Sequence, residues 1–550
     1  MPDVQFNLAL AQEAVSAAVP DREYLIWRDR RFTYSQLTER SRRLASYLHQ
    51  RGLGARVERD QLAGHESGQD HVALYMRNGN EFIESMLGAF KSRTVPVNVN
   101  YRYVADELRY LFGDAEPAAV IYHADFAPTL AQVRDALPDD VVLIQVADDS
   151  GHELLPGAVD YEDALTQGAP ELPATVTPDD LHIIYTGGTT GMPKAVLWRQ
   201  HDIFSAAMGG QLPGAWEPVN TYDDLVQRAL TTPPMRLMLL PPLMHGAAQW
   251  GAFTQINLGG TLVLPDDNTR LDAADVLRVA AGAGASAMMI IGDAMARPLI
   301  AELEVNSYDL STLFLIGSGS VTLSPELKKR LHELLPNVII TDGVGSSETG
   351  PQGTYVSTKD SVQTGTFTVG PGARVADETL SELLQPGADS IGWLMQTGCI
   401  PLGYLGDREK TERTFPVIDG VRYAVPGDRA RLLEDGAVRL LGRDSVTINS
   451  GGEKIFAEEV EAAVKSHPSV ADVIVTGRPN ERWGQEVVAL VQVVDGTEFD
   501  EAVLAQHAGQ QLARYKVPKA WIVVPEVRRS PVGKADYRWA NSIATQRVTS

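Results

Sequence analysis

A short loop rich in glycine and hydroxyl side chains offers the clearest chemistry in the sequence. It follows the apolar run 182–185 and ends on a lysine. Glycines leave backbone N–H groups free to approach an anion, and the threonines and the lysine add further donors. The candidate phosphate ligands are Thr186, Gly187, Gly188, Thr189, Thr190, Gly191 and Lys194. The loop predicts a phosphate-binding site, with a flexible polar turn as the alternative; no Gly-Lys pair closes it as in a G-x-x-x-x-G-K-[ST] loop.

Four charged side chains stand in short motifs further along the chain: Glu348 in Gly-Ser-Ser-Glu-Thr, Asp428 in Pro-Gly-Asp, Arg443 in Gly-Arg-Asp and Lys534 in Ser-Pro-Val-Gly-Lys. From about residue 20 to residue 540, the phosphate loop and these motifs, in this order, resemble the adenylate-forming superfamily of acyl-CoA synthetases, peptide-synthetase adenylation domains and firefly luciferase. The resemblance implies an AMP-forming acid–CoA ligase. Such an enzyme joins a carboxylic acid to AMP and then transfers the acyl group to the thiol of coenzyme A.

The resemblance also implies a role for each charged residue. Glu348 would hold Mg²⁺, because a hard cation prefers carboxylate oxygens. Asp428 would bind the ribose hydroxyls, and Arg443 would contact ribose and phosphate. Lys534 would enter the site for adenylation. Lys534, Glu348 and Thr186 are therefore the expected catalytic residues, although each charged side chain could instead be a solvated turn or surface group.

The adenine site is expected on two segments that the resemblance matches to the two sides of the base. Asp342 would contact the adenine amine, and the segment from Gly319 would line the opposite side; a strand-end cap and a turn glycine are the alternatives. Val344 stands where most relatives have an aromatic residue. The remaining expected nucleotide ligands are Ser320, Gly343, Gly345, Ser346 and Ser347.

The acyl substrate is expected near His245, which falls where the family places an aromatic residue or a histidine; a histidine satisfied in the core is the alternative. The other expected acyl-site residues are Trp250, Gly292, Met295 and Gly317. Segments 292–298, 448–454 and 530–539 look like those of actinobacterial ligases for steroid side-chain acids. We therefore expect a bulky hydrophobic acid, such as a steroid side-chain carboxylate. A medium- or long-chain fatty acid stays open, because apolar pockets discriminate by only about 1–3 kcal/mol per methylene.

Coenzyme A is expected at a glycine-rich segment late in the chain, by the same resemblance: Ser450, Gly451, Gly452, Glu453 and Lys454. A small domain would rotate to bring this segment into place, with Asp444 or Ser445–Val446 as the pivot. The rivals are an adenylation enzyme that loads a carrier-protein thiol, a luciferase-type oxidase, and a regulatory nucleotide-binding protein without chemistry.

The elements that position these motifs alternate between short apolar runs and helical stretches, which predicts an α/β fold. We expect a large N-terminal domain of layered, largely parallel sheets with helices over residues 1–442, and a small, mobile α+β C-terminal domain over residues 443–550. Residues 32–54 carry apolar positions at helical spacing, with Thr33 or Ser35 as a possible N-cap. The polar stretch 57–70 predicts a surface loop, and 457–465 predicts a helix.

The composition narrows the class of protein further. A formal charge of −23 disfavours a nucleic-acid-binding or anionic-membrane-binding surface, because both require a basic footprint. The single cysteine, Cys399, cannot form an internal disulfide. Because neither a leader pattern nor a long apolar run is visible, we expect a cytoplasmic protein without stable membrane insertion. Its expected cofactors and partners are ATP, Mg²⁺, coenzyme A and a small carboxylic acid; a homo-oligomer stays open.

Overall fold

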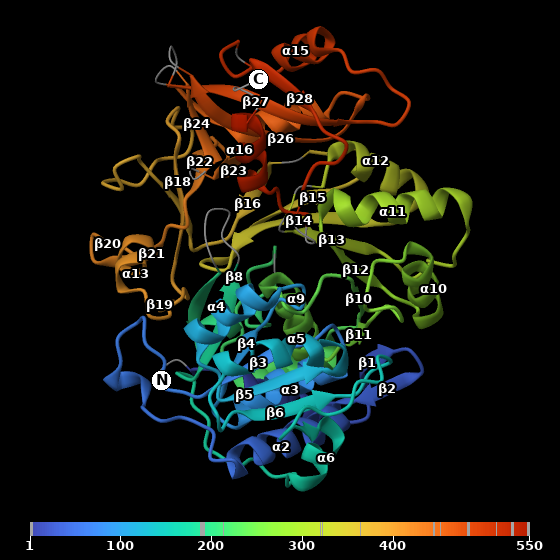
Figure 1. Cartoon of the computed structure of the whole chain (residues 1–550), viewed down its shortest axis with the longest axis vertical. Helices are drawn as coiled ribbons and strands as arrows, with labels where there is room; N and C mark the ends of the chain where they lie inside the picture. Colours follow the sequence, from blue (N-terminus) through green and yellow to red (C-terminus); the bar gives the residue numbers. More distant parts are fainter. Residues whose placement is uncertain are drawn as a thin grey trace.

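The computed structural model describes residues 4–546 except 187–192, 213, 320, 322, 364, 444–445, 451–452, 481–483, 513 and 530–532, and leaves out the side chains of 449, 453, 454 and 484. The N-terminal elements fill the lower part of Figure 1 and the C-terminal ones the top, with strands β14 to β16 between them.

The first sheet has the strand order β19-β9-β8-β4-β3-β5-β6-β7. Its strands are β3 (His71–Tyr75), β4 (Val95–Asn98), β5 (Ala119–His123), β6 (Val142–Val146), β7 (Val159–Asp160), β8 (Leu181–Thr186), β9 (Lys194–Arg199) and β19 (Gly403–Tyr404). The strands from β8 to β7 run parallel, and β9 and β19 add to one edge in antiparallel orientation. All of β3 is buried, as expected for a parallel strand covered on both faces.

The second sheet begins as a parallel sheet and continues as an antiparallel one. Its parallel part, with β2 as an antiparallel edge, contains β1 (Glu23–Trp27), β2 (Arg30–Thr33), β10 (Arg236–Leu239), β11 (Thr261–Val263), β12 (Ala287–Ile290), β13 (Leu315–Gly319) and β14 (Ile339–Ser346). The antiparallel part contains β15 (Gly350–Ser357), β16 (Thr366–Val369), β17 (Ala373–Ala376), β18 (Gly392–Thr397), β20 (Val417–Ile418), β21 (Val421–Ala424), β22 (Asp428–Leu432) and β23 (Val438–Arg443). The sequence did not separate this antiparallel part. Several of its strands are joined by connections too short for a parallel crossover.

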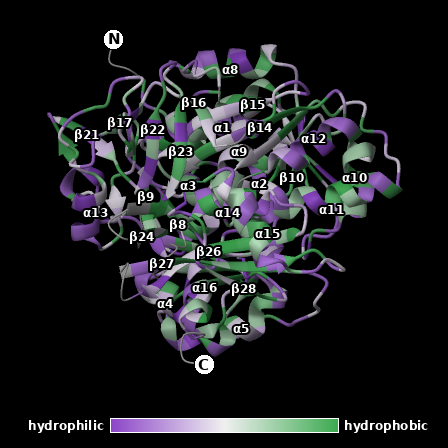
Figure 2. Cartoon of the chain, turned by 90° about the horizontal axis from the view of Figure 1, so that it is seen from above, coloured by the Kyte–Doolittle hydropathy of each residue, from purple (hydrophilic) through white to green (hydrophobic). Residues whose placement is uncertain are grey.

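Helices cover these sheets, and α9 lies between them. They are α1 (Leu8–Ala18), α2 (Tyr34–Gln50), α3 (Asn80–Lys91), α4 (Ala105–Ala115), α5 (Ala127–Gln132), α6 (Tyr161–Gln167), α7 (Gln200–Ala207), α8 (Tyr222–Thr231), α9 (Gly246–Asn257), α10 (Ala273–Ala283), α11 (Gly292–Val305), α12 (Pro325–Leu334) and α13 (Arg408–Thr414). Thr33 caps α2 in a capping box with Gln36, which confirms one of the two expected caps. Figure 2 shows hydrophilic residues gathered on outer helices such as α8 and α13.

The C-terminal elements form a separate sheet of order β25-β24-β27-β26, with β28 parallel to β27. They are β24 (Thr447–Ser450), β25 (Glu453–Phe456), α14 (Ala457–Lys465), β26 (Val470–Asn480), β27 (Gly484–Val493), α15 (Glu501–Gly509), β28 (Ala520–Val523) and α16 (Tyr537–Gln546). This sheet and its helices have their own apolar core. The expected α/β class is confirmed, as is the helix 457–465. The surface loop expected over 57–70 contains a short 3₁₀ helix, Arg59–Gln61.

Candidate active site

The phosphate loop is held at both ends by the β8–β9 hairpin, in which Thr186 and Lys194 are paired residues. Asn98 connects this hairpin to the segment before α9: it accepts a hydrogen bond from the Tyr185 N–H at 2.8 Å and donates one to the Met244 carbonyl at 2.6 Å. Lys194 Nζ lies 3.6 Å from Asp407 Oδ2. The five remaining residues expected in this loop, Gly187, Gly188, Thr189, Thr190 and Gly191, lie outside the described residues.

Glu348 is half-buried in the turn between β14 and β15 and is surrounded by polar groups. The Tyr404 hydroxyl donates to Glu348 Oε1 at 2.8 Å, and Lys410 Nζ lies 4.1 Å from the centre of the Tyr404 ring. Burial lowers the pKa of Lys410, and the nearby Glu348 carboxylate opposes that shift. The turn itself is anchored, since Trp198 Nε1 donates to the Ser347 carbonyl at 2.9 Å. An oriented carboxylate of this kind fits Mg²⁺.

Lys534 lies in the same charged environment, although it belongs to the segment between β28 and α16. Burial lowers its pKa, Arg443 lowers it further, and Glu348 and Asp428 oppose the shift. Lys534 is nevertheless exposed to solvent. Arg443 Nε donates to Asp428 Oδ1 at 3.0 Å, and the two residues are partners in the β22–β23 ladder. The structure thus brings four predicted charged residues together.

Gly533, the residue before Lys534, lies close to the large N-terminal part of the chain. Gly533 has φ +75°, a conformation that favours glycine, and a Cβ there would lie 3.6 Å from both Ala294 in α11 and Val321. Lys465 in α14 makes a second connection, because its Nζ lies 3.2 Å from Asp293 in α11 and 3.2 Å from Asp472 in β26. These two contacts connect the C-terminal part of the chain, which carries Lys534, to α11.

The two expected adenine segments lie side by side. Gly317, Ser318 and Gly319 in β13 pair with Thr341, Asp342 and Gly343 in β14. On its other side, β14 pairs with β15, and that ladder is irregular between Val344 and Gly345. Ser346 is buried, and its N–H donates a hydrogen bond to the Thr349 hydroxyl oxygen at 3.0 Å. Ser320 lies outside the described residues.

Asp342 has a partner that the sequence did not reveal. Lys328 in α12 is fully buried, and its ammonium donates to Asp342 Oδ2 and, at 2.6 Å, to the Gln363 carbonyl. Burial raises the pKa of Asp342, and the Lys328 charge opposes the shift. Lys328 stands beside two other basic residues, Lys329 and Arg330, so the local sequence reads as an ordinary charged helix face.

His245 and Trp250 present polar ring atoms that lack a protein partner within the described ranges. The His245 Nε2 and Trp250 Nε1 atoms are buried without a hydrogen bond. Burial lowers the pKa of His245 to about 3, and Lys534 and Arg102 add to that effect. The imidazole is therefore neutral near pH 7 and can serve as a hydrogen-bonding group, but it is too weak a base to remove a proton efficiently.

Of the remaining acyl-site residues, Gly292 and Met295 lie in the first turn of α11, directly after β12, and Gly317 lies in β13. Gly292 has φ +47°, and its N–H donates to Ser318 Oγ at 3.1 Å. Met295 accepts at its sulfur from the Ile291 N–H at 3.3 Å. A Cβ at Gly251 of α9 would lie 2.9 Å from Met289 Sδ in β12. The helix that carries Trp250 therefore packs closely on the strand that leads to Gly292.

The expected coenzyme A segment is a hairpin between β24 and β25. Ser450 pairs with Glu453 and with Gly484 in β27. Gly451 and Gly452, and the side chains of Glu453 and Lys454, lie outside the described residues.

Comparison with known proteins finds sequence similarity over almost the whole chain. Residues 12–400 match the family model of the AMP-binding enzyme, and residues 459–534 match that of the AMP-binding enzyme C-terminal domain. The chain is 57% identical to the medium-chain acyl-CoA ligase Mig of Mycobacterium avium, over 98% of each chain. It is 42% identical to a medium/long-chain-fatty-acid–CoA/3-oxocholest-4-en-26-oate–CoA ligase of Mycobacterium marinum, over 98% of this chain and 96% of the relative.

Solved structures share the fold at low sequence identity. The anthranilate CoA ligase AuaEII with anthranoyl-AMP superposes with a TM-score of 0.82 at 20% identity, covering 100% of this chain and 99% of the other. ATP-bound MatB from Rhodopseudomonas palustris gives 0.80 at 22% identity, covering 98% and 100%. Within the described residues, no helix is long and apolar enough to cross a membrane. The motif order, the arrangement of the charged residues and these matches together show that the chain belongs to the AMP-binding enzyme family.

Proposed function

We propose that this AMP-forming acyl-CoA ligase activates hydrophobic carboxylic acids, and that medium-chain fatty acids are its preferred substrates. The observation that carries the proposal is the meeting of Lys534 with Glu348 and the Arg443–Asp428 pair. Lys534, a cation from the C-terminal part of the chain, lies near Glu348, the candidate Mg²⁺ ligand, and this arrangement is suited to adenylate formation.

In the first half-reaction, a carboxylate oxygen of the acid attacks the α-phosphorus of ATP in line, and the bond to pyrophosphate breaks. Negative charge grows on the phosphoryl oxygens, so the main work of the protein is positioning and electrostatic stabilisation. Lys534, Arg443 and the loop 186–194 would supply the positive charge and N–H donors, and Asp428 would orient the ribose. Glu348 would hold Mg²⁺, which neutralises phosphate charge when bound.

In the second half-reaction, the sulfur of coenzyme A attacks the acyl carbonyl carbon, and AMP leaves with the electron pair of the mixed anhydride bond. We propose that residues 443–550 form the small domain that turns for this step and that Ser450–Lys454 faces the coenzyme. The change of sheet supports this boundary, since β23 ends at Arg443 and β24 begins a separate sheet at Thr447.

The choice of acid rests on the relatives and on the two orphaned ring N atoms. The 57% identical relative is named for medium-chain acids. His245 and Trp250 offer buried hydrogen-bonding atoms to a ligand. Steroid side-chain acids are the second candidate, because a 42% identical relative is named for fatty acids and 3-oxocholest-4-en-26-oate alike, and a 39% identical one from Rhodococcus rhodochrous for the steroid acid alone.

The test is pyrophosphate release by the purified chain with fatty acids of graded length and with steroid side-chain acids, each with and without coenzyme A. Mass spectrometry of the thioester identifies the product. Turnover of medium-chain fatty acids with thioester formation supports the proposal. Turnover of steroid side-chain acids alone would instead identify the second candidate as the substrate. Lys534→Ala should lower pyrophosphate release by about 10²–10³-fold while leaving thioester formation from supplied acyl-adenylate near the wild-type rate. An equal loss in both steps would contradict the role of Lys534.

We also propose that the enzyme works in the cytoplasm, where ATP and coenzyme A are both supplied. The absence of a membrane-crossing helix in the described ranges is compatible with that location. Fractionation of cells that express the tagged chain would test the location, and recovery in the membrane or secreted fraction would overturn it.

A further inference from the structure

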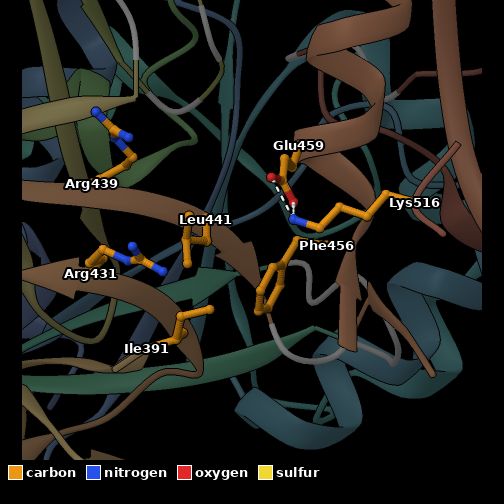
Figure 3. Close-up of a pocket in the computed structure, with 7 residues that line it drawn as sticks. All are labelled: Ile391, Arg431, Arg439, Leu441, Phe456, Glu459 and Lys516. Carbon is orange, nitrogen blue, oxygen red and sulfur yellow. Dashed lines mark hydrogen bonds and ion pairs between the residues drawn. The ribbon is translucent and has the colours of Figure 1, made fainter. Parts of the chain in front are cut away.

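A cavity of about 230 Å³ lies between the antiparallel part of the second sheet and the C-terminal elements (Figure 3), and neither Lys534 nor Glu348 is among its lining residues. Its lining residues are Ile391, Arg431, Arg439, Leu441, Phe456, Glu459 and Lys516. Figure 3 shows the two arginines, Leu441 and Ile391 on one side and the other three residues on the opposite side. The walls therefore come from both the large N-terminal part and the C-terminal part.

Two arginines line this cavity, and neither has a counter-charge among the described residues. Arg431 in β22 and Arg439 in β23 are direct partners in an antiparallel ladder, so their side chains leave the same face of the sheet. Like charges directly opposite one another destabilise such a pair. Neither guanidinium has a hydrogen bond or an ion pair within the part of the chain that the structure describes. Two adjacent arginines of this kind contrast with the net charge of −23 of the whole chain.

The opposite wall adds shape but little net charge. Lys516 Nζ is bound by both carboxylate oxygens of Glu459 at 2.7 Å, so this pair is internally neutralised. Phe456 is buried and, with Ile391 and Leu441, gives the cavity an apolar surface. The lining therefore carries about two unneutralised positive charges beside an apolar wall. A dianion with a small apolar substituent matches that distribution.

We propose that this cavity binds a phosphate dianion, free or as a small phosphate monoester, through the guanidiniums of Arg431 and Arg439. A phosphate carries a charge of about −1.5 to −2 near pH 7 and three acceptor oxygens, which suits the planar donor forks of two arginines. The substituent of a monoester would lie against Phe456. Because the two walls belong to different parts of the chain, the bound anion also joins those parts in the arrangement seen here.

The experiment measures binding of inorganic phosphate and of phenyl phosphate to the full chain by titration calorimetry. The nucleotide site is first saturated with the α,β-methylene analogue of ATP, so that its phosphate positions are occupied and added phosphate cannot enter them. We expect one saturable site in the wild type. Phenyl phosphate should bind more tightly than inorganic phosphate if the apolar wall is used, and equal affinity would assign the site to the free ion.

The double variant Arg431→Gln/Arg439→Gln should weaken binding at least 10-fold, because it removes both charged hydrogen-bonding partners of the phosphate. Arg538→Gln, which removes an exposed arginine of α16, serves as the matched control and should bind like the wild type. Thermal unfolding without phosphate checks the fold, and the double variant should melt no lower than the wild type because charge repulsion is relieved. Wild-type affinity in the double variant, or absence of saturable binding to the wild type, would overturn the proposal.

Discussion

At the scale of single residues, the buried pair Lys328–Asp342 determines how one expected nucleotide ligand is held. The ammonium of Lys328 occupies Asp342 Oδ2, which leaves the other carboxylate oxygen to meet a ligand. A buried ion pair of this kind orients its members, but it gives little net stability because both charges lose water. Lys328 is therefore a positioning residue for Asp342 in our reading of the nucleotide site.

Lys328→Met should destabilise the protein by about 3–5 kcal/mol, because Asp342 then becomes a buried carboxylate without a counter-charge. Urea denaturation measures the loss, and the KM for ATP should rise in the same variant. Lys329→Met changes the neighbouring, exposed lysine and should stay within about 0.5 kcal/mol of the wild type.

The double variant Lys328→Met/Asp342→Asn separates charge from packing. Removing both charges relieves the burial penalty, so its stability should return most of the way to that of the wild type. A double variant as unstable as Lys328→Met would show that the lysine acts through packing alone.

At the scale of elements, the contact between β23 and α14 is unusually close. Gly442 has φ +127°, and a Cβ at that position would lie 2.3 Å from Glu458 Oε2. Glycine is required there for the backbone conformation and for the approach of the helix. The strand that carries Arg443 is thereby pressed against the first turn of α14.

Gly442→Ala should destabilise the chain more than Gly436→Ala, as measured by the midpoint of urea denaturation. Both positions have positive φ, but a Cβ at Gly436 would meet nothing within 4 Å, so Gly436→Ala reports backbone strain alone. The difference should be about 1–3 kcal/mol, the usual cost of overpacking. Equal midpoints would mean that Glu458 moves aside freely.

Two buried carboxyl groups of α14 make this element sensitive to pH. Burial raises the pKa of Glu458 to about 7 and that of Glu461 to about 8 from the ordinary 4.5, and the repulsion between the two adds to the shift of Glu461. Glu461 Oε1 accepts hydrogen bonds from the Val475 N–H and the Tyr537 hydroxyl. Arg443 near Glu458 and Arg529 near Glu461 are positive charges that favour the ionised carboxylates and so oppose these upward pKa shifts.

Because both pKa values are higher in the folded state, the stability that the protonated groups contribute is complete below pH 4.5 and is lost as the pH rises to about 8. Glu461→Gln keeps the acceptor oxygen and removes the titration. It should be more stable than the wild type at pH 8 by about 1–3 kcal/mol and similar at pH 5. Denaturation curves at both pH values test this, with Glu501→Gln, an exposed carboxylate of α15, as the charge control. A gain independent of pH would contradict the argument.

At the scale of the whole molecule, Lys465 links the C-terminal part to α11. Its partners are Asp293 on the N-terminal side and Asp472 on its own side, and Arg529 also binds Asp472. Losing Lys465 therefore leaves Asp472 paired, while Asp293 loses a link across the interface. The Lys534 turn, which rests on the same helix α11, should become less firmly placed.

Lys465→Met should lower the rate of pyrophosphate release by about 2–10-fold, since a partly exposed ion pair contributes about 1 kcal/mol. Lys465→Arg keeps the charge and should retain most of the activity. High salt, near 1 M, where the screening length is about 3 Å, should slow the wild type towards the variant. A variant as fast as the wild type at low salt would show that the other contacts suffice.

The sequence predicted the elements and the local motifs well because those depend on neighbouring residues. Apolar runs marked most of the buried parallel strands, and Thr33 marked the start of α2. The phosphate loop and the motif around Glu348 could be assigned because each is contained in a few consecutive residues. The family, the fold class and the ligase chemistry followed from the order of such motifs.

The partners of those residues could not be predicted in the same way. Tyr404 beside Glu348, Lys328 beside Asp342 and Lys465 beside Asp293 all join separate elements, and only the order of the strands and the packing of the helices brings them together. The sequence by itself determined the elements and the chemical groups available. The tertiary structure decided which charges share a site, because electrostatic interactions depend on distance in space, and a chain that crosses between sheets sets those distances independently of separation along the sequence.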